Sequence, residues 1–198
     1  MIRFNQIINS DIIDGKTPST KRFDYNEIEI NNPSKNYFRY WNPFKSTLSA
    51  AILCGLEIIP INKNSPLLYV GDISNESSLN LLDLVENKQK IFCFNKSKLH
   101  NSDYANLQYI QNLQQLDGKK FSIIYINDSN YPIENSLDLS NKLMNESSYL
   151  IILLSKSSLE KFNQIFTKLL ENFELLQELN IEFYFKEKSL LILRRKLS

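Results

Sequence analysis

Three residues with a special chemistry or conformation follow short apolar segments of the chain: Gly71, Asn95 and Asp128. Glycine lets a backbone approach a ligand closely, an amide side chain donates and accepts hydrogen bonds, and a carboxylate accepts several. If the apolar segments are parallel strands of one sheet, these residues lie at its carboxyl edge, where such sheets bind ligands. The sequence therefore predicts a polar binding site in the loops that follow the strands.

Other kinds of site find little support in the sequence. Cys54 and Cys93 are far apart and match no metal-ligand spacing, so we predict small buried residues in a reducing compartment. The single histidine, His100, cannot by itself form a metal cluster or a histidine-based triad. We expect His100 at the surface and predict no bound metal.

The composition is that of one globular domain. Of 198 residues, 42% are hydrophobic and 23% are charged, which is within the globular range. The net charge of +1 gives no overall basic excess, so contact with nucleic acid must come from a local patch. No apolar run approaches the roughly 18–20 residues of a membrane span, and the first residues lack a signal-peptide pattern. We therefore expect a soluble, intracellular protein that does not enter a membrane.

The elements that would position the site alternate between strand and helix. Apolar runs predict strands at 67–71, 91–94, 122–126 and 149–154. Apolar periodicity predicts helices at 47–56, 77–85 and 159–173, and a terminal β-hairpin is predicted at 181–185 and 189–193. This alternation favours an α/β fold with a parallel sheet and right-handed crossovers.

A terminal helix followed by a hairpin is the layout of the seven-stranded, Rossmann-like class I methyltransferase fold. The pattern alone leaves other doubly wound folds open. We place a small β-rich N-terminal extension at 1–36 and a methyltransferase-like domain at 37–198.

The most specific signal is the segment WNPFKSTLSAAIL at 41–53, which contains the only tryptophan. It resembles the YRxWNPFRSKLAAAIL segment of the fibrillarin family, and the similarity continues without a gap into LLYVG at 67–71. Weaker similarity extends upstream to 11–22 and downstream to 181–188. On these motifs the chain resembles fibrillarin, the 2'-O-methyltransferase subunit of box C/D small nucleolar ribonucleoproteins (snoRNPs).

The resemblance implies S-adenosylmethionine as the cofactor, although most of the motif positions carry other residues. The glycine-rich GAASGTT motif corresponds to 71–77, the ribose-binding glutamate to Asn95, and the adenine-binding EDAR segment to about 111–114. The cofactor-binding positions implied are Gly71, Glu76, Ser77, Asn95, Lys96, Asn112 and Asp128. From the residues alone, 71–77 also fits a strand-to-helix turn without a ligand.

Methylating a ribose 2'-hydroxyl needs removal of its proton and an in-line approach to the sulfonium methyl group. The resemblance implies two lysines, an aspartate and a histidine or glutamate for this task. At these positions the chain has Thr47, Ser155, Asp128 and Lys188, with Lys156 one residue beyond Ser155. Asp128, Lys156 and Lys188 are therefore the catalytic candidates. Asp128 also fits a turn cap, and the two lysines also fit solvated surface charges.

Basic and aromatic residues interleave ahead of the helix predicted at 47–56. Arg39 and Lys45 stand among aromatic residues, a mixture that suits phosphate contact with base stacking and equally suits the edge of a core. These two residues are the RNA-binding candidates. The resemblance implies as partners a guide snoRNA, ribosomal RNA, a Nop-type scaffold protein and the kink-turn-binding protein of the particle. It implies a location in the nucleus and nucleolus, where the nucleus can also be a reduced one.

By resemblance, the chain acts in ribosomal RNA processing and guide-directed 2'-O-methylation of rRNA. An alternative is a catalytically inactive snoRNP subunit that binds scaffold protein and RNA without S-adenosylmethionine. The two differ in whether the substituted positions still bind the cofactor. A third interpretation, an unrelated Rossmann-like enzyme, is disfavoured by the lack of a glycine-rich loop and of any histidine or cysteine constellation.

Overall fold

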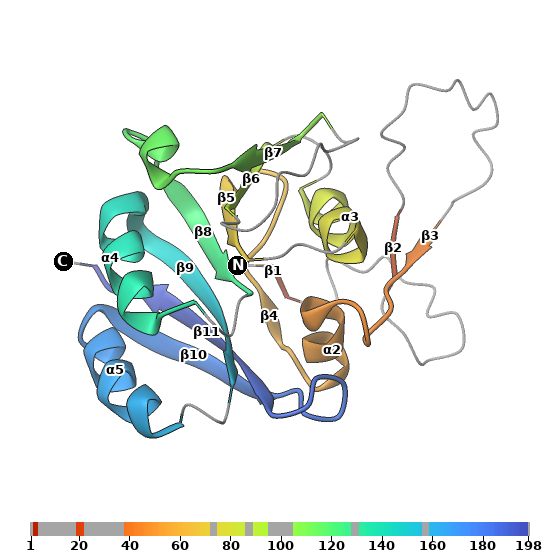
Figure 1. Ribbon diagram of the computed structural model, residues 1–198. Helices are drawn as coiled ribbons and strands as arrows, with labels where there is room; N and C mark the ends of the chain where they lie inside the picture. The colour runs from red at the N-terminus through yellow and green to blue at the C-terminus, as the bar shows by residue number, and fades with distance from the viewer. Residues whose placement is uncertain are drawn as a thin grey trace.

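Figure 1 shows the computed structural model, which describes residues 2–3, 19–21, 38–71, 75–85, 89–94, 105–127, 131–155 and 159–197. A seven-stranded sheet in the order β10-β11-β9-β8-β5-β6-β7 forms its centre. The strands are β5 (Leu67–Val70), β6 (Ile91–Phe94), β7 (Leu107–Ile110), β8 (Phe121–Ile126), β9 (Met144–Ser155), β10 (Phe173–Asn180) and β11 (Lys188–Arg195). Strands β5 to β9 run parallel, whereas β11 runs antiparallel to both β9 and β10.

Helices cover both faces of this sheet (Figure 1). The helices are α2 (Thr47–Leu53), α3 (Asn75–Leu84), α4 (Ile133–Leu143) and α5 (Leu159–Asn172), with a 3-10 turn η2 (Leu113–Leu116) after β7. Each face has its own apolar cluster, one with α2 and α3 and the other with α4 and α5. Because neighbouring side chains in a strand point to opposite faces, Leu68 packs towards α4 and α5 while Tyr69 packs towards α2 and α3. The predicted α/β methyltransferase-type fold is confirmed.

A tight turn leads into helix α2 and sets its direction. The side-chain oxygen of Asn42 accepts a hydrogen bond from the amide of Phe44 at 2.9 Å, and its carbonyl accepts from the amides of Lys45 and Ser46, each at 3.1 Å. Ser46 then caps the helix by accepting from the amide of Ser49 at 3.3 Å. The turn residues therefore satisfy amides that a helix start leaves without partners.

Glycine ends the same helix. Gly55 has φ +93°, and the amides of Gly55 and Leu56 donate to the carbonyls of Ile52 and Ala51 at 3.1 and 2.9 Å. This pair of hydrogen bonds is the Schellman arrangement, which needs a left-handed residue and therefore favours glycine. The helix predicted at 47–56 is confirmed, with its end at Leu53.

Short strands outside the main sheet involve the N-terminal part of the chain. Strand β1 (Ile2–Arg3) pairs with β4 (Ile58–Ile59), and β2 (Ser19–Lys21) pairs with β3 (Phe38–Tyr40). The division into an extension at 1–36 and a domain at 37–198 stays a prediction. Among the described helices, none is long and apolar enough to cross a membrane.

The first strand of the terminal hairpin was predicted at 181–185, which is wrong. Strand β10 ends at Asn180, and 181–187 form the loop that leads to β11. The amides of Tyr184 and Phe185 both donate to the carbonyl of Ile181, at 3.0 and 2.9 Å, so the chain turns there. The alternating sequence IEFYF imitates a strand, but only Ile181 is fully buried.

Candidate functional site at the carboxyl edge of the sheet

A chain of hydrogen bonds joins helix α2 to the ends of two central strands. The hydroxyl oxygen of Thr47, the first residue of α2, lies 2.5 Å from the hydroxyl of Tyr125 on β8 and 2.9 Å from the side-chain oxygen of Asn127. The amide nitrogen of Asn127 donates to the hydroxyl of Tyr69 on β5. We call these four residues the Thr47 network.

The direction of the hydrogen bonds follows from the number of protons available. Thr47 has one hydroxyl proton and donates it to Asn127, so the hydroxyl of Tyr125 must donate to Thr47. Burial raises the pKa of Tyr125 well above its ordinary value, and the hydrogen bond to Thr47 offsets this only in part. Thr47, Tyr125 and Asn127 are therefore neutral near pH 7, and hydrogen bonds connect them to one another and to Tyr69.

A narrow recess opens beside the network, between α2 and α3. Its lining includes Thr47, Tyr69 and Tyr125 together with Ser77 and Asn80. It contains about 190 Å³ of empty space, solvent at its mouth included. Both polar atoms of the Asn80 side chain lack a hydrogen-bond partner although the residue is only 1% exposed. An unsatisfied buried amide costs about 1–3 kcal/mol, so Asn80 is a destabilising residue of this site.

Two of the predicted cofactor positions lie where β5 leads into α3. Gly71 follows β5 with φ +124°, and its amide donates to the carbonyl of Phe94 at 2.9 Å. This left-handed conformation explains the glycine, with or without a ligand. Ser77 is buried in the first turns of α3, and its hydroxyl donates to the carbonyl of Lys45 at 3.4 Å. Glu76 precedes it in α3.

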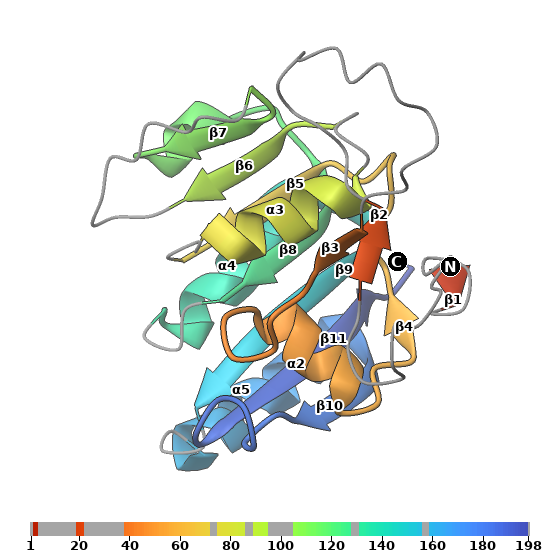
Figure 2. The ribbon, with the colours of Figure 1, turned by 90° about the vertical axis from the view of Figure 1, so that its right-hand side faces the viewer.

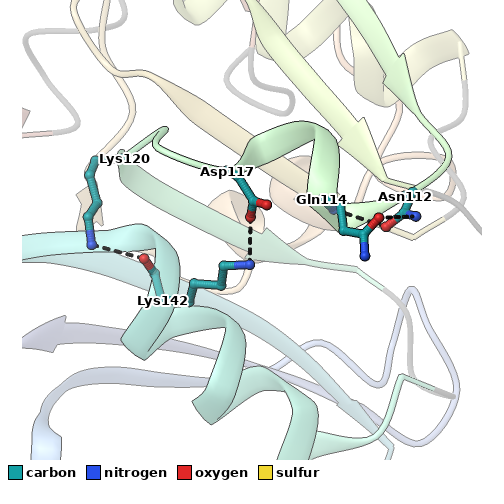
Figure 3. A network of polar contacts seen from close by, with 5 residues as sticks. All are labelled: Asn112, Gln114, Asp117, Lys120 and Lys142. Carbon is teal, nitrogen blue, oxygen red and sulfur yellow. Dashed lines mark hydrogen bonds and ion pairs between the residues drawn. The ribbon is translucent and has the colours of Figure 1, made fainter.

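Asn112, the predicted adenine-side residue, is an exposed helix cap. Its side-chain oxygen accepts from the amide of Gln114 at 2.9 Å and its nitrogen donates to the Gln114 side chain at 3.2 Å, as Figure 3 shows. Asp117 ends the same 3-10 turn and pairs with Lys142 of α4 at 2.6 Å. Both charged groups are more than half exposed, so the pair contributes less than about 1 kcal/mol. The Asn112 side chain is thus used to hold its own turn.

Of the three catalytic candidates, only Lys188 lies within the described residues. Lys188, the first residue of β11, is half-buried and lies opposite Ser155, the last residue of β9. Thr47 bonds to Asn127, the neighbour of Asp128. Of the four positions to which the resemblance assigned catalysis, the structure therefore pairs Ser155 with Lys188 and joins Thr47 to the end of β8.

Other candidates are either peripheral or beyond the described ranges. Lys45 is exposed in the turn before α2, and Arg39 lies in β3 opposite Thr20. The described residues contain no group of three acidic, cysteine or histidine side chains that could bind a metal. Four predicted site residues fall outside the described residues, namely Asn95, Lys96, Asp128 and Lys156.

Tyr69 and Tyr125, which line the recess, are not among the predicted site residues. In the sequence, each stands within an apolar run that predicts a strand. They occupy paired positions on the parallel strands β5 and β8, and their rings pack edge to face with centroids 5.2 Å apart. The matching position of tyrosine in LLYVG and SIIYI was the signal that could have located them.

A sheet of five parallel strands followed by an antiparallel hairpin, with a polar site at its carboxyl edge, defines a class I methyltransferase fold. The family model named Fibrillarin matches residues 6–116 of the sequence. The chain belongs to the fibrillarin family.

Curated relatives agree with this assignment. A fibrillarin-like rRNA/tRNA 2'-O-methyltransferase of Methanococcus voltae is 27% identical over 137 residues, which cover 67% of this chain and 56% of that protein. The corresponding protein of Methanococcus aeolicus is 30% identical over 112 residues, covering 57% of this chain and 45% of that protein. The chain thus spans about half the length of the curated relatives it matches.

Solved structures match nearly the whole chain. The Methanococcus jannaschii fibrillarin pre-rRNA processing protein has a TM-score of 0.75 at 20% identity, covering 95% of this chain and 93% of that one. A fibrillarin/Nop5p complex scores 0.73 at 18% identity, covering 90% and 94%. Aeropyrum pernix fibrillarin with natively bound S-adenosyl-L-methionine scores 0.73 at 14% identity, covering 88% and 87%. Identities this low show a shared fold.

Proposed function

We propose that this chain is the fibrillarin-type subunit of a box C/D snoRNP and acts there in ribosomal RNA processing and guide-directed 2'-O-methylation. The observation that carries the proposal is the family match at 6–116 combined with a fold that matches fibrillarin over 95% of the chain. Its proposed partners are guide snoRNA, rRNA, a Nop-type scaffold protein and the kink-turn-binding protein. The fibrillarin/Nop5p complex of the same fold supports the scaffold partner. Such a particle places the chain in the nucleolus.

S-adenosylmethionine is the cofactor implied by the family. Two of the described residues at its implied positions, Ser77 and Asn112, already use their side chains in hydrogen bonds to other groups of the protein. These contacts by themselves give no support to cofactor binding by Ser77 or Asn112.

A second candidate function is favoured by the Thr47 network. Methylation of a 2'-hydroxyl needs a group that takes up its proton. Thr47 occupies the position of a family lysine, and its neighbour Tyr125 keeps its own proton because burial raises its pKa. A subunit that binds scaffold protein and RNA without transferring a methyl group itself accounts for this arrangement. We infer that the family's position in the particle is kept while its proton acceptor at Thr47 is not.

Calorimetric titration with S-adenosylmethionine and with its demethylated product separates the two functions. Binding in the micromolar range would support an active methyltransferase, with the cofactor held by residues beyond the described ranges. No heat at hundreds of micromolar would support the inactive subunit. Aeropyrum pernix fibrillarin, which binds S-adenosyl-L-methionine natively, is the positive control.

Membership of the particle needs a test that does not depend on the cofactor. The tagged chain should recover a Nop-type scaffold protein and box C/D RNA from cells, and purified scaffold protein should bind the purified chain directly. Failure of both measurements would contradict the proposed function whatever the titration shows.

A further inference from the structure

Two of the most exposed large side chains of the described residues lie beside one another. Phe183 is 81% exposed and Phe44 is 63% exposed. Tyr184 stands between them: its ring centroid is 5.2 Å from that of Phe44 and 4.9 Å from that of Phe183, at interplanar angles of 68° and 83°. We call Phe44, Phe183 and Tyr184 the aromatic platform.

The platform joins two segments that are far apart in the sequence. Phe44 belongs to the turn before α2, and the other two rings belong to the loop between β10 and β11, on the same side of the molecule in Figure 2. A hydrogen bond fixes the backbone of each segment. The amide of Phe44 donates to the side-chain oxygen of Asn42, and the amide of Tyr184 donates to the carbonyl of Ile181. The half-buried Tyr184 also packs against the apolar cluster under α2 and α3. The ring of Tyr184 is therefore held by the fold, and the rings of Phe44 and Phe183 each pack edge to face against it.

The charges around the platform are mixed. Lys45 follows Phe44 in the sequence, Lys186 stands two residues after Tyr184, and both side chains are exposed. Glu182 and Glu187 are exposed in the loop between β10 and β11. Two lysines can contact one or two phosphates, but the two carboxylates prevent a strongly positive surface. Binding here must draw mainly on the rings.

The exposed area favours small flat groups over a protein surface. With about 200 Å² for each phenylalanine side chain, Phe44 and Phe183 together expose roughly 300 Å². A stable protein interface buries about 800 Å² on each partner. The flat face of one unpaired base matches a single exposed ring, and aromatic rings with a nearby lysine are a common way to bind single-stranded RNA.

The platform also borders the candidate site. Phe44 lies three residues before Thr47, and the loop of Phe183 runs directly into Lys188, which pairs with Ser155. An RNA strand that reaches the carboxyl edge of the sheet between these segments would lie next to the platform. We propose, on the basis of the proposed function, that the aromatic platform stacks unpaired bases of single-stranded RNA while Lys45 and Lys186 contact its phosphates.

Fluorescence anisotropy with a labelled oligouridine of about eight nucleotides tests this proposal. Phe183→Ala should weaken binding by the full chain roughly five- to a hundred-fold, as expected for loss of one stacked base. Phe183→Tyr should restore binding, whereas Phe183→Leu should not, because leucine keeps the apolar surface without the ring. Leu197→Ala, which removes a 73% exposed residue elsewhere, is the matched control and should leave binding unchanged.

Salt dependence gives a second readout. Two phosphate contacts predict a slope of about −1.4 for the logarithm of affinity against the logarithm of salt concentration. The slope should be unchanged in Phe183→Ala. It should become less steep in the double variant Lys45→Gln, Lys186→Gln, which lacks both phosphate contacts. Thermal unfolding of each variant checks that an exposed substitution has left the fold intact.

Several results would overturn the proposal. These are no binding of RNA by the wild-type chain, equal binding by Phe183→Ala, and full binding by Phe183→Leu. Loss of scaffold-protein binding in Phe183→Ala with unchanged RNA affinity would instead assign the platform to a protein partner. If the wild-type chain fails to recover scaffold protein and box C/D RNA, only the proposed function is contradicted. The stacking proposal is unaffected by that result, because stacking is measured on purified chain and RNA.

Discussion

The segment 41–56 and the carboxyl edge of the sheet are in contact, yet they use their polar groups differently. In the segment, Asn42 and Ser46 satisfy backbone amides at the start of α2, and Gly55 permits the hydrogen bonds at its end. At the edge, Thr47 and Tyr125 bond to each other and present no charged group. The first region fixes the start and the end of α2, and the second joins that helix to β5 and β8 through neutral side chains. Backbone hydrogen bonds therefore set the direction of the helix, whereas side-chain hydrogen bonds set its position against the sheet.

Trp41→Ala should have the largest effect, because it removes the anchor of the positioning segment. Trp41 is 1% exposed, and its carbonyl accepts a hydrogen bond from the hydroxyl of Ser49 at 3.0 Å. Loss of a fully buried large aromatic side chain costs about 3–5 kcal/mol. Urea unfolding followed by far-UV circular dichroism measures this loss. Phe44→Ala, which removes an exposed ring three residues away, should change the free energy of unfolding by less than about 0.5 kcal/mol. Equal effects of the two substitutions would show that the segment is not held by Trp41.

Thr47→Val should come second, because it breaks the network at the edge while keeping the shape of the side chain. It leaves the buried hydroxyl of Tyr125 without an acceptor and removes the donor to Asn127, at a cost of about 1–3 kcal/mol. Thr47→Ser keeps the hydroxyl and is the matched control.

A double-mutant cycle with Tyr125→Phe makes the comparison sharper. If the two hydroxyls bond as described, the double variant should lose less stability than the sum of the two single variants. Strict additivity would show that the hydrogen bond between Thr47 and Tyr125 does not form in solution.

High pH should also lower the free energy of unfolding of the protein, by about 1.4 kcal/mol for each pH unit. The pKa of buried Tyr125 is raised in the folded state. Below about pH 10 the hydroxyl is neutral in both states, whereas above it only the unfolded chain loses the proton, so stability falls as pH rises. Unfolding free energies of the wild-type chain and Tyr125→Phe should therefore diverge from about pH 10 upwards.

Cys93 provides the control for this pH dependence. Burial raises the pKa of its thiol in the folded state as well, and the ordinary thiol value is lower than that of tyrosine. Cys93→Ala should consequently flatten the curve from about pH 8.5, before Tyr125→Phe has any effect. Parallel curves for all three proteins would contradict the burial of both groups.

The comparison also separates what the sequence could predict from what it could not. Apolar runs of strand length and helical periodicity identified β5, β6, β8 and α5, because these patterns follow from burial on both faces of a sheet or on one face of a helix. Strands β7 and β10 and helix α4 were missed. The burial of β10 is irregular, and a bulge interrupts its pairing between Leu175 and Gln177. In α4 the serines Ser136 and Ser140 are buried, which weakens the apolar pattern.

The site was predictable where one residue type is required by the backbone. Gly71 was placed correctly at the end of a strand, where its left-handed conformation favours glycine, and its role in binding the cofactor stays a prediction. The Thr47 network was not predicted, since its members lie 78 and 80 residues apart in sequence and tyrosine in a strand reads as part of the core. Asn80 was missed for a related reason: on a helix rich in leucine, a polar residue is expected to face solvent.

Asn80→Leu has the smallest expected effect among the changes at the site, and it is the only change here expected to stabilise the protein. Asn80 keeps a buried amide without a partner beside the Thr47 network, so leucine of similar volume should raise the free energy of unfolding by about 1 kcal/mol. Asn80→Asp buries a carboxylate at the same place and should destabilise the fold. If Asn80→Leu lowers stability instead, the amide has a partner in solution, and the edge of the sheet still binds a polar group. A gain in stability would place Asn80 with Thr47 and Tyr125, as a residue of a site closed by its own side chains.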